Sequence, residues 1–433
     1  MISVKTKPKC HVFPGMLTFK IWMWFQLSEE SQAILSSSRE SKLPPNRWNH
    51  ATAVLKNSIY LFGGRNSERI FADLWKLSLD TVSWEEILPS SKKPTALHDH
   101  SMVAWNNSLY VFGGGYLTFG PGCLWIFSTE KQHWRLVKVS NSSWPHGRRA
   151  HAATIHKDVM YVFGGYQDLR GPLNDLWLFD LHNEVWSQIL TAGECPSPRQ
   201  CHLFLVSGFN LYIHGGISNK KEFGDLWRLD LKIKKWRLLR QRGGPKKLHS
   251  HMGILADGFM FIFGGMKEGK YRGKSWKLKI DTLTWEKVVS PLMTPSDRAS
   301  SSIHEVPKMY LPSVLEALHS PASFLQVPRI FSSLSSSVLQ PRSTDRVPRV
   351  SSLPNALSSR LGIRRQSLVK RSTAEEEEDT HTFRKSLKTK ESVYSLENNV
   401  NACDFKCFLL LGGVGEQECI RSSSSLSIWA ALL

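Results

Sequence analysis

The 433-residue sequence predicts an all-β protein built from repeated copies of one four-stranded unit. Glycine pairs end apolar runs five times, at steps of 50, 51, 51 and 49 residues, and a histidine stands 13 residues before each pair. Two tryptophans, always nine residues apart, follow each pair. Self-similarity at this period, with glycine turns and regularly placed aromatics, is typical of all-β repeat proteins.

The repeated residues occupy fixed positions in every unit. The glycine pairs are Gly63-Gly64, Gly113-Gly114, Gly164-Gly165, Gly215-Gly216 and Gly264-Gly265. The tryptophan pairs are Trp75 and Trp84, Trp125 and Trp134, Trp177 and Trp186, Trp227 and Trp236, and Trp276 and Trp285. The histidines are His50, His100, His151, His202 and His251. We interpret all of them as structural, because glycines permit close backbone approach and buried tryptophans pack neighbouring units together.

Each unit is expected to contain four strands, which in the first unit cover 51–55, 59–62, 74–79 and 83–87. The constant spacings are typical of hairpins, because a one-residue slip would turn every side chain to the wrong face. Asp257-Gly258 in the fifth unit is a strong signal for such a hairpin turn. Length varies only after each glycine pair and after each second tryptophan, so these segments are predicted to be loops.

With one such unit per ~50 residues, the sequence resembles the kelch-repeat β-propeller family. The resemblance covers about residues 44–295 and rests on motifs such as Tyr60-Leu61-Phe62-Gly63-Gly64 and Asp73-Leu74-Trp75. It implies a kelch-type β-propeller of five full blades plus a partial sixth. Two units depart from the pattern. Cys123 and Lys274 replace the aspartate, and in the same units Leu97 and Leu248 replace an arginine.

The sixth unit begins with Arg298 and has Ser301 in the histidine position. Its Met309-Tyr310-Leu311 resembles Ile59-Tyr60-Leu61 of the second strand in the first unit, but Pro312 then stands where the glycine pair should be and the unit stops. We therefore expect residues 1–43 to form an N-terminal segment in which 19–27 could supply a closing strand, since kelch propellers often join strands from both chain ends. An incomplete ring is the alternative. The propeller is expected over 44–318, followed by a mostly disordered Ser/Pro/Arg-rich tail at 319–433. No periodicity is interpretable in 408–433, where Leu411-Gly412-Gly413 is too isolated to count as a repeat.

Composition restricts the classes of function. The seven scattered cysteines are typical of free thiols in a reducing compartment. Neither a signal peptide nor a membrane span is expected, so a cytoplasmic location is predicted, with the nucleus as the alternative. Phosphate loops, metal-binding histidine pairs and nucleophile elbows are not found in the sequence, so we predict neither an enzyme nor a bound cofactor or metal. The five histidines would stand too far apart around a ring to hold one ion.

The predicted function is therefore that of a protein-interaction module or scaffold. The net charge is +19, and residues 44–295 carry 33 Lys/Arg against 20 Asp/Glu, which suits an acidic partner surface. Nucleic acid is the less favoured partner, because the basic run 232–247 is not interleaved with stacking aromatics.

Partner contacts are expected from the loops after the glycine pairs, because tyrosine and arginine are enriched in binding hot spots. The basic members suggest an acidic epitope or a C-terminal carboxylate. Ordinary solvated loops are the alternative interpretation. The candidate residues are Arg65, Arg69, Tyr116, Phe119, Tyr166, Arg170, Lys220, Lys221, Lys267, Tyr271 and Arg272.

The resemblance also leaves other roles open. Many kelch proteins present substrates to cullin-RING ubiquitin ligases, and residues 311–318 resemble the short helix by which some of them dock an elongin-cullin adaptor. Pro321 would end this helix early, and the usual cysteine is missing. A kelch-like propeller enzyme is the least favoured alternative. Ser367, which follows Arg364-Arg365-Gln366, is a candidate phosphorylation site.

Overall fold

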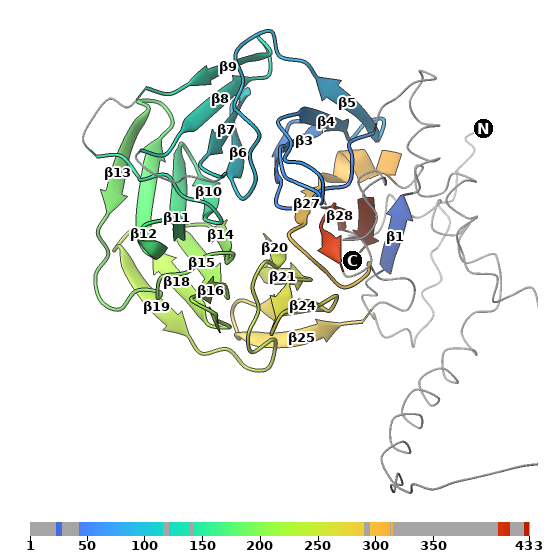
Figure 1. Ribbon diagram of the computed structural model, residues 1–433. Helices are drawn as coiled ribbons and strands as arrows, with labels where there is room; N and C mark the ends of the chain where they lie inside the picture. Colours follow the sequence, from blue (N-terminus) through green and yellow to red (C-terminus); the bar gives the residue numbers. More distant parts are fainter. Residues whose placement is uncertain are drawn as a thin grey trace, which may run out of the picture. The chain divides into compact units, whose positions relative to one another are not determined.

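The computed structural model describes residues 23–27, 43–115, 121–138, 143–289, 295–311, 313–314, 406–415 and 428–432. Within these ranges, six four-stranded antiparallel sheets are arranged around a central axis as the blades of a propeller (Figure 1). The β-propeller expected from the repeats is therefore confirmed. Among the described residues, no helix is long and apolar enough to cross a membrane.

The five repeats form blades one to five, each in simple sequence order from the axis outward. Blade one contains β2 (Ala51–Leu55), β3 (Ser58–Phe62), β4 (Leu74–Ser78) and β5 (Ser83–Ile87). Blade two contains β6 (Ser101–Trp105), β7 (Ser108–Phe112), β8 (Leu124–Ser128) and β9 (His133–Leu136). Blade three contains β10 (Ala152–His156), β11 (Val159–Gln167), β12 (Gly171–Asp180) and β13 (Val185–Ile189).

Blades four and five each add a small hairpin after the glycine pair. Blade four contains β14 (Leu203–Ser207), β15 (Asn210–His214), β18 (Leu226–Asp230) and β19 (Lys235–Leu239), with the hairpin β16 (Ile217–Ser218) and β17 (Lys221–Glu222). Blade five contains β20 (Met252–Ala256), β21 (Phe259–Phe263), β24 (Ser275–Lys279) and β25 (Thr284–Val288), with the hairpin β22 (Met266–Lys267) and β23 (Lys270–Tyr271).

The second tryptophan of each repeat packs against the preceding blade. The Trp134 ring lies 5.2 Å from Phe62 of blade one, Trp186 lies 4.9 Å from Phe112 of blade two, and Trp236 lies 5.7 Å from Phe163 of blade three. Each of these tryptophans is at most 4% exposed. A buried tryptophan removes about 150–250 Å² from water, so these contacts hold neighbouring blades together.

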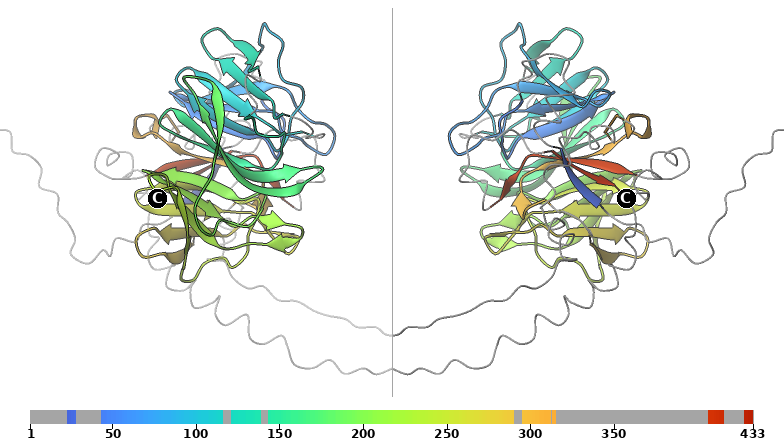
Figure 2. Two further views of the ribbon diagram at one scale, coloured as in Figure 1. Left: turned by 90° about the vertical axis from the view of Figure 1, so that its left-hand side faces the viewer. Right: turned by 90° about the vertical axis from the view of Figure 1, so that its right-hand side faces the viewer.

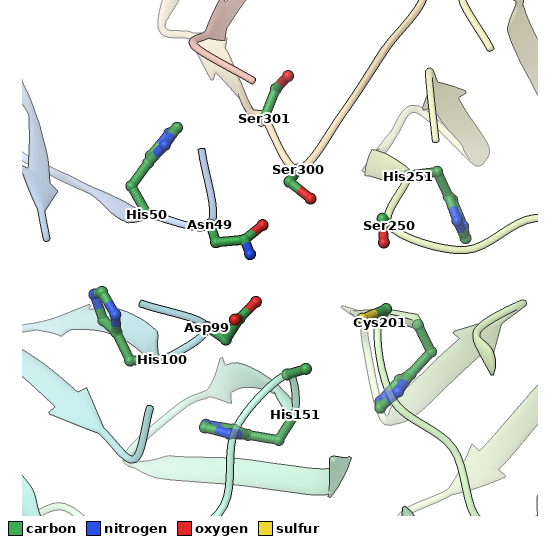
Figure 3. A pocket seen from close by; sticks show the side chains of 12 residues that line it. Asn49, His50, Asp99, His100, His151, Cys201, Ser250, His251, Ser300 and Ser301 are labelled. Carbon is green, nitrogen blue, oxygen red and sulfur yellow. The ribbon is translucent and has the colours of Figure 1, made fainter. Parts of the chain in front are cut away.

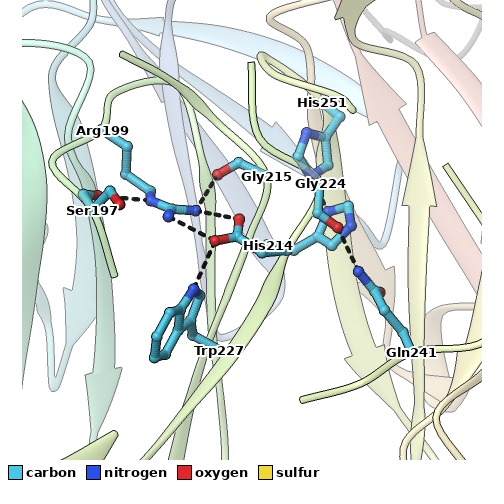
Figure 4. A network of polar contacts seen from close by, with 9 residues as sticks. Ser197, Arg199, His214, Gly215, Gly224, Trp227, Gln241 and His251 are labelled. Carbon is cyan, nitrogen blue, oxygen red and sulfur yellow. Dashed lines mark hydrogen bonds and ion pairs between the residues drawn. The ribbon is translucent and has the colours of Figure 1, made fainter. Parts of the chain in front are cut away.

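In three of the blades, a buried arginine joins an aspartate to the backbone at the end that carries the glycine pair. In blade four, the Arg199 guanidinium donates to both Asp225 carboxylate oxygens at 2.7 and 2.9 Å and to the Gly215 carbonyl at 2.9 Å (Figure 4). Trp227 Nε1 donates to the same carboxylate at 2.7 Å. The three such pairs are Arg47–Asp73, Arg148–Asp175 and Arg199–Asp225.

Blades two and five replace both members of this pair together. Leu97 and Cys123 occupy the arginine and aspartate positions of blade two, and Leu248 and Lys274 occupy those of blade five. Losing the aspartate alone would leave a buried guanidinium uncompensated, which is strongly destabilising. Joint replacement avoids that cost and explains why the two departures occur in the same repeats.

The sixth blade joins three segments that are distant in sequence, in the order β27 (Ser302–Val306), β28 (Cys407–Leu411), β30 (Ile428–Leu432) and β1 (Met23–Leu27). The right-hand view of Figure 2 shows β1, in blue, beside the red C-terminal strands. Near the axis, the short strand β26 (Arg298–Ala299) pairs with β29 (Val414–Gly415). The N-terminal strand thus forms the outer edge of the last blade, inside the range 19–27 identified from the sequence.

The expectation for the second strand of this blade was wrong. Met309-Tyr310-Leu311 does not supply it, since residues 308–310 form a 3-10 turn (η1, Lys308–Tyr310). The strand is Cys407–Leu411, and Leu411-Gly412-Gly413 is a genuine repeat motif. Gly412 and Gly413 have φ values of 62° and 100°, close to those of the other glycine pairs, and Arg298 Nη1 donates to the Gly412 carbonyl at 3.1 Å.

Candidate binding site at the channel mouth

Six residues, one from each blade, form a closed ring of backbone hydrogen bonds around the axis. All six adopt the left-handed conformation, with φ between 52° and 58°. Each N–H donates to the carbonyl of the equivalent residue in the preceding blade at 2.8–3.3 Å, and Asn49 closes the circle by donating to Ser300. The ring consists of Asn49, Asp99, Ala150, Cys201, Ser250 and Ser300. Its closure fixes the geometry of this end of the channel.

The ring surrounds a cavity of about 150 Å³ at the channel mouth. Five repeat histidines and Ser301 complete its lining. In Figure 3, the short side chains of Asn49, Asp99, Ser250 and Ser300 point toward the middle, whereas the histidine rings lie farther out. Short polar groups therefore line the cavity centre.

The histidines pack between blades and not toward the axis. A Cβ on Gly63 of blade one would lie 2.9 Å from His100 Cε1 of blade two, and a Cβ on Gly114 would lie 2.6 Å from His100 Cβ. Only glycine leaves room for this contact, which explains the constant 13-residue spacing. Hydrogen bonds to neighbouring blades add to it, as between His151 Nε2 and Ser101 Oγ at 2.8 Å.

Burial keeps these histidines neutral. Desolvation lowers the pKa of His100 to about 4 and that of His202 to about 3. They therefore bring no positive charge to the mouth at neutral pH. Among the described residues, no cluster of three His, Cys, Asp or Glu side chains is placed to hold a metal ion.

Asp99 is the charged residue in the cavity lining. Its Oδ2 lies 2.6 Å from His98 Nδ1, and its side chain is 21% exposed. The Cys201 thiol, two positions farther around the ring, has its pKa raised to about 12, mainly by burial and further by the Asp99 charge. A thiol that stays protonated is a weak nucleophile.

The loops after the glycine pairs lie directly beside this ring. Arg65 exchanges two backbone hydrogen bonds of 2.9 Å with Trp48, the residue before Asn49. Tyr166 does the same with Arg149, and Met266 with His249. The candidate loops and the cavity therefore share one face of the propeller.

The structure divides the candidate partner-binding residues into three groups. Exposed side chains belong to Arg69, Arg170, Lys220 and Lys221. Partly buried ones belong to Arg65, Tyr166, Lys267, Tyr271 and Arg272. Tyr116, Phe119 and the candidate phosphorylation site Ser367 lie outside the described residues.

Some of these groups are held by contacts within the loops. The Arg69 guanidinium lies 4.8 Å from the Phe71 ring, and the Tyr166 ring lies 4.8 Å from Arg149, which also pairs with Asp168 at 2.6 Å. Such contacts orient the loops on the mouth face.

Sequence reasoning missed the ring residues, which differ chemically from blade to blade. Their shared signal is position, because each immediately precedes the repeat histidine or, in blade six, Ser301. The proposed adaptor-binding helix is also affected. Leu311 and Val314 are 7% and 0% exposed and pack in a cluster with Trp84, so the propeller itself uses these two side chains.

Positive charge is concentrated on one side of the ring. Residues 217–289, which span the outer half of blade four and all of blade five, hold 18 Lys/Arg and 7 Asp/Glu. Residues 44–216 hold 15 and 13. The basic field of the propeller therefore originates mainly in blades four and five.

Comparisons with known proteins agree with this architecture. A family model described as "FBX42, beta-propeller domain" matches residues 47–236. The mouse Rab9 effector protein with kelch motifs is 31% identical over 172 residues, covering 39% of this chain and 45% of its own. Acyl-CoA-binding domain-containing protein 5 of Arabidopsis thaliana is 30% identical over 233 residues, covering 51% and 36%.

A third relative is the mouse leucine-zipper-like transcriptional regulator 1, which is 28% identical over 278 residues and covers 58% of this chain and 33% of its own. The chain thus spans less than half the length of each of these relatives.

Proposed function

We propose that the chain, which is similar to kelch-repeat β-propeller proteins, is a protein-interaction module that holds a partner on its mouth face. The observation that carries the proposal is the ring of six interlocked backbone residues with the repeat loops arranged around it. A rigid frame that presents variable loops is the usual arrangement of binding surfaces. The similarity to the Rab9 effector protein with kelch motifs supports the same coarse role.

The chemistry of the mouth favours binding over catalysis. The repeat histidines are buried, neutral and packed against glycines, and Cys201 is a protonated thiol. A general base needs a pKa near the operating pH and access to the substrate. The mouth groups whose pKa is shifted satisfy neither requirement.

We infer an acidic epitope for the periphery of the site. Lys220 and Lys221 are exposed at the tip of the β16–β17 hairpin, on the side of the ring that carries the excess of Lys/Arg. Opposite potentials steer association and lower its rate at high salt. A cullin-RING receptor role and a cytoplasmic or nuclear location would be consistent with this module.

The test is affinity purification with the full chain as bait, followed by binding assays on each recovered partner. Arg170→Glu combined with Lys221→Glu reverses two exposed charges on the mouth face, and affinity is expected to fall about tenfold or more. Lys56→Glu combined with Lys131→Glu makes the same charge change in turns on the opposite face and serves as the control. Equal affinities of the two double variants would contradict the proposed face.

A further inference from the structure

We propose that the channel mouth accepts a single lysine or arginine side chain of the partner, at the centre of the otherwise acidic epitope. The inference rests on the proposed function, because it specifies which residue of a bound partner reaches the axis. It follows from the distribution of hydrogen-bond donors and acceptors in the ring.

The ring has used its backbone donors. Each of the six residues contributes one N–H, and that N–H is bonded to the next carbonyl around the circle. A carbonyl oxygen has two lone pairs, so each ring carbonyl keeps acceptor capacity after receiving its one bond. The backbone at the mouth is therefore short of donors and rich in acceptors.

The side chains add one negative charge to this arrangement. Asp99 points toward the middle of the cavity, and the lining contains no lysine or arginine. The bond from His98 occupies one of about four acceptor positions of the carboxylate. Ser250 and Ser300 add hydroxyl groups that can accept as well as donate.

An ammonium or guanidinium group matches such a site best. Lysine supplies three donors and arginine five, with no acceptor. A partner carboxylate at the same place would face Asp99 without a neighbouring cation, which is unfavourable where charges are partly desolvated. The cavity of about 150 Å³ has room for one side chain and not for a folded segment.

The cavity and its surroundings then favour ligand groups of opposite charge. The axis selects a cation, while the exposed lysines of blade four select carboxylates farther out. A uniformly acidic or uniformly basic segment would satisfy only one of the two regions. The preferred epitope is therefore a lysine or arginine flanked by acidic residues.

The experiment is selection from a display library of random twelve-residue peptides, with the full chain as bait. Selected peptides are expected to share one lysine or arginine, and Asp99→Asn should weaken their binding about tenfold or more. Asparagine tolerates the left-handed conformation of position 99 and can still accept the His98 bond, so the fold should be unchanged. Asp281→Asn, in an exposed turn on the opposite face, removes the same charge and should leave binding unchanged.

Two further variants connect the effect to the cavity. Ala150→Lys would place an internal ammonium at the mouth and should also weaken binding; lysine already occupies this conformation at Lys56 and Lys157. Replacing the peptide's basic residue with norleucine should reduce binding to the unmodified chain but cause no further loss in Asp99→Asn.

The outcomes separate the two proposals. Two results would overturn the cation site but leave the proposed interaction face intact. In both, the selected peptides lose affinity in the Arg170→Glu/Lys221→Glu variant. In the first they require no lysine or arginine, and in the second they bind Asp99→Asn as well as the unmodified chain. Failure to select any peptide that depends on mouth-face residues overturns both.

Discussion

The buried Arg148–Asp175 ion pair allows the cost of an uncompensated buried charge to be measured. Arg148 is 1% exposed and donates to Asp175 at 2.6 and 2.8 Å, to Gly164 O at 3.0 Å and to His146 O at 3.2 Å. Asp175→Ala removes both charge-assisted bonds and leaves the guanidinium buried with two backbone acceptors. We expect a loss of about 3–5 kcal/mol in the free energy of unfolding, as for a broken buried ion pair.

Arg148→Leu should lower the free energy of unfolding by less than Asp175→Ala does. The abandoned Asp175 carboxylate is 24% exposed and keeps the bond from Trp177 Nε1 at 2.7 Å, so water and this donor compensate it in part. We expect about 2–3 kcal/mol, which includes the lost bond to Gly164 O.

The decisive comparison is the double variant Arg148→Leu/Asp175→Cys, which installs the pair that blade two already uses. Its loss of stability should be smaller than the sum of the losses for Arg148→Leu and for the single variant Asp175→Cys by at least about 1 kcal/mol. Urea unfolding followed by tryptophan fluorescence measures all the variants. Strict additivity would refute the view that Leu97 with Cys123 is a joint solution to the removal of a buried charge.

Three further predictions concern the last blade, the histidines and the thiols. Phe408→Ala should cost about 3–5 kcal/mol, because this ring is 0% exposed and packs 5.5 Å from Phe261; an unchanged urea midpoint would mean that blade six does not hold the ring closed. The folded-state pKa of His100 and His202 lies below the usual 6.5, at about 4 and 3, so their contribution to stability is complete above pH 6.5 and is lost as the pH falls toward those values. At pH 5 the upper limit is about 2 kcal/mol per histidine, and a urea midpoint that stays flat between pH 7 and 5 would contradict it. Exposed Cys123 should react with iodoacetamide at pH 8 much faster than Cys201, whose pKa is raised to about 12, and equal labelling by mass spectrometry would argue against burial of that thiol.

Spacing alone was enough to predict blades one to five, because every strand of a blade lies within one repeat and the two-residue turns fix its register. Positions such as Lys56 and Asn106 adopt the positive φ that these turns require. The same method failed for blade six, whose strands are separated in sequence. The strand register gives blade six two tryptophans equivalent to Trp75 and Trp84 of blade one. Trp429, which pairs with Leu410, corresponds to Trp75, and Trp24, which pairs with Ala431, corresponds to Trp84. These two tryptophans are about 400 residues apart in the sequence, so their constant spacing is lost.

The mouth could not be predicted for a different reason. One backbone conformation is occupied by asparagine, aspartate, alanine, cysteine and serine, so residue identity carries no common signal. The hydrogen bond to the neighbouring blade selects the conformation, and this bond exists only once the two blades have packed together. The predicted loops, by contrast, lie together on one face, because the glycine pairs mark the end of a strand that must turn there.

The construction of blade six has a consequence for the order in which the ring forms. Val306 pairs with Cys407, so residues 307–406 must be looped out before the inner two strands can meet, whereas Leu55 and Ser58 pair across a two-residue turn. In the unfolded chain the longer closure costs about 3–4 kcal/mol more. The five local blades can therefore form first, and blade six is expected to form last and to unfold first. A partner that contacts blades five, six and one together would stabilise blade six in its folded state. Amide hydrogen exchange at Phe408–Leu411 would then slow when the partner binds.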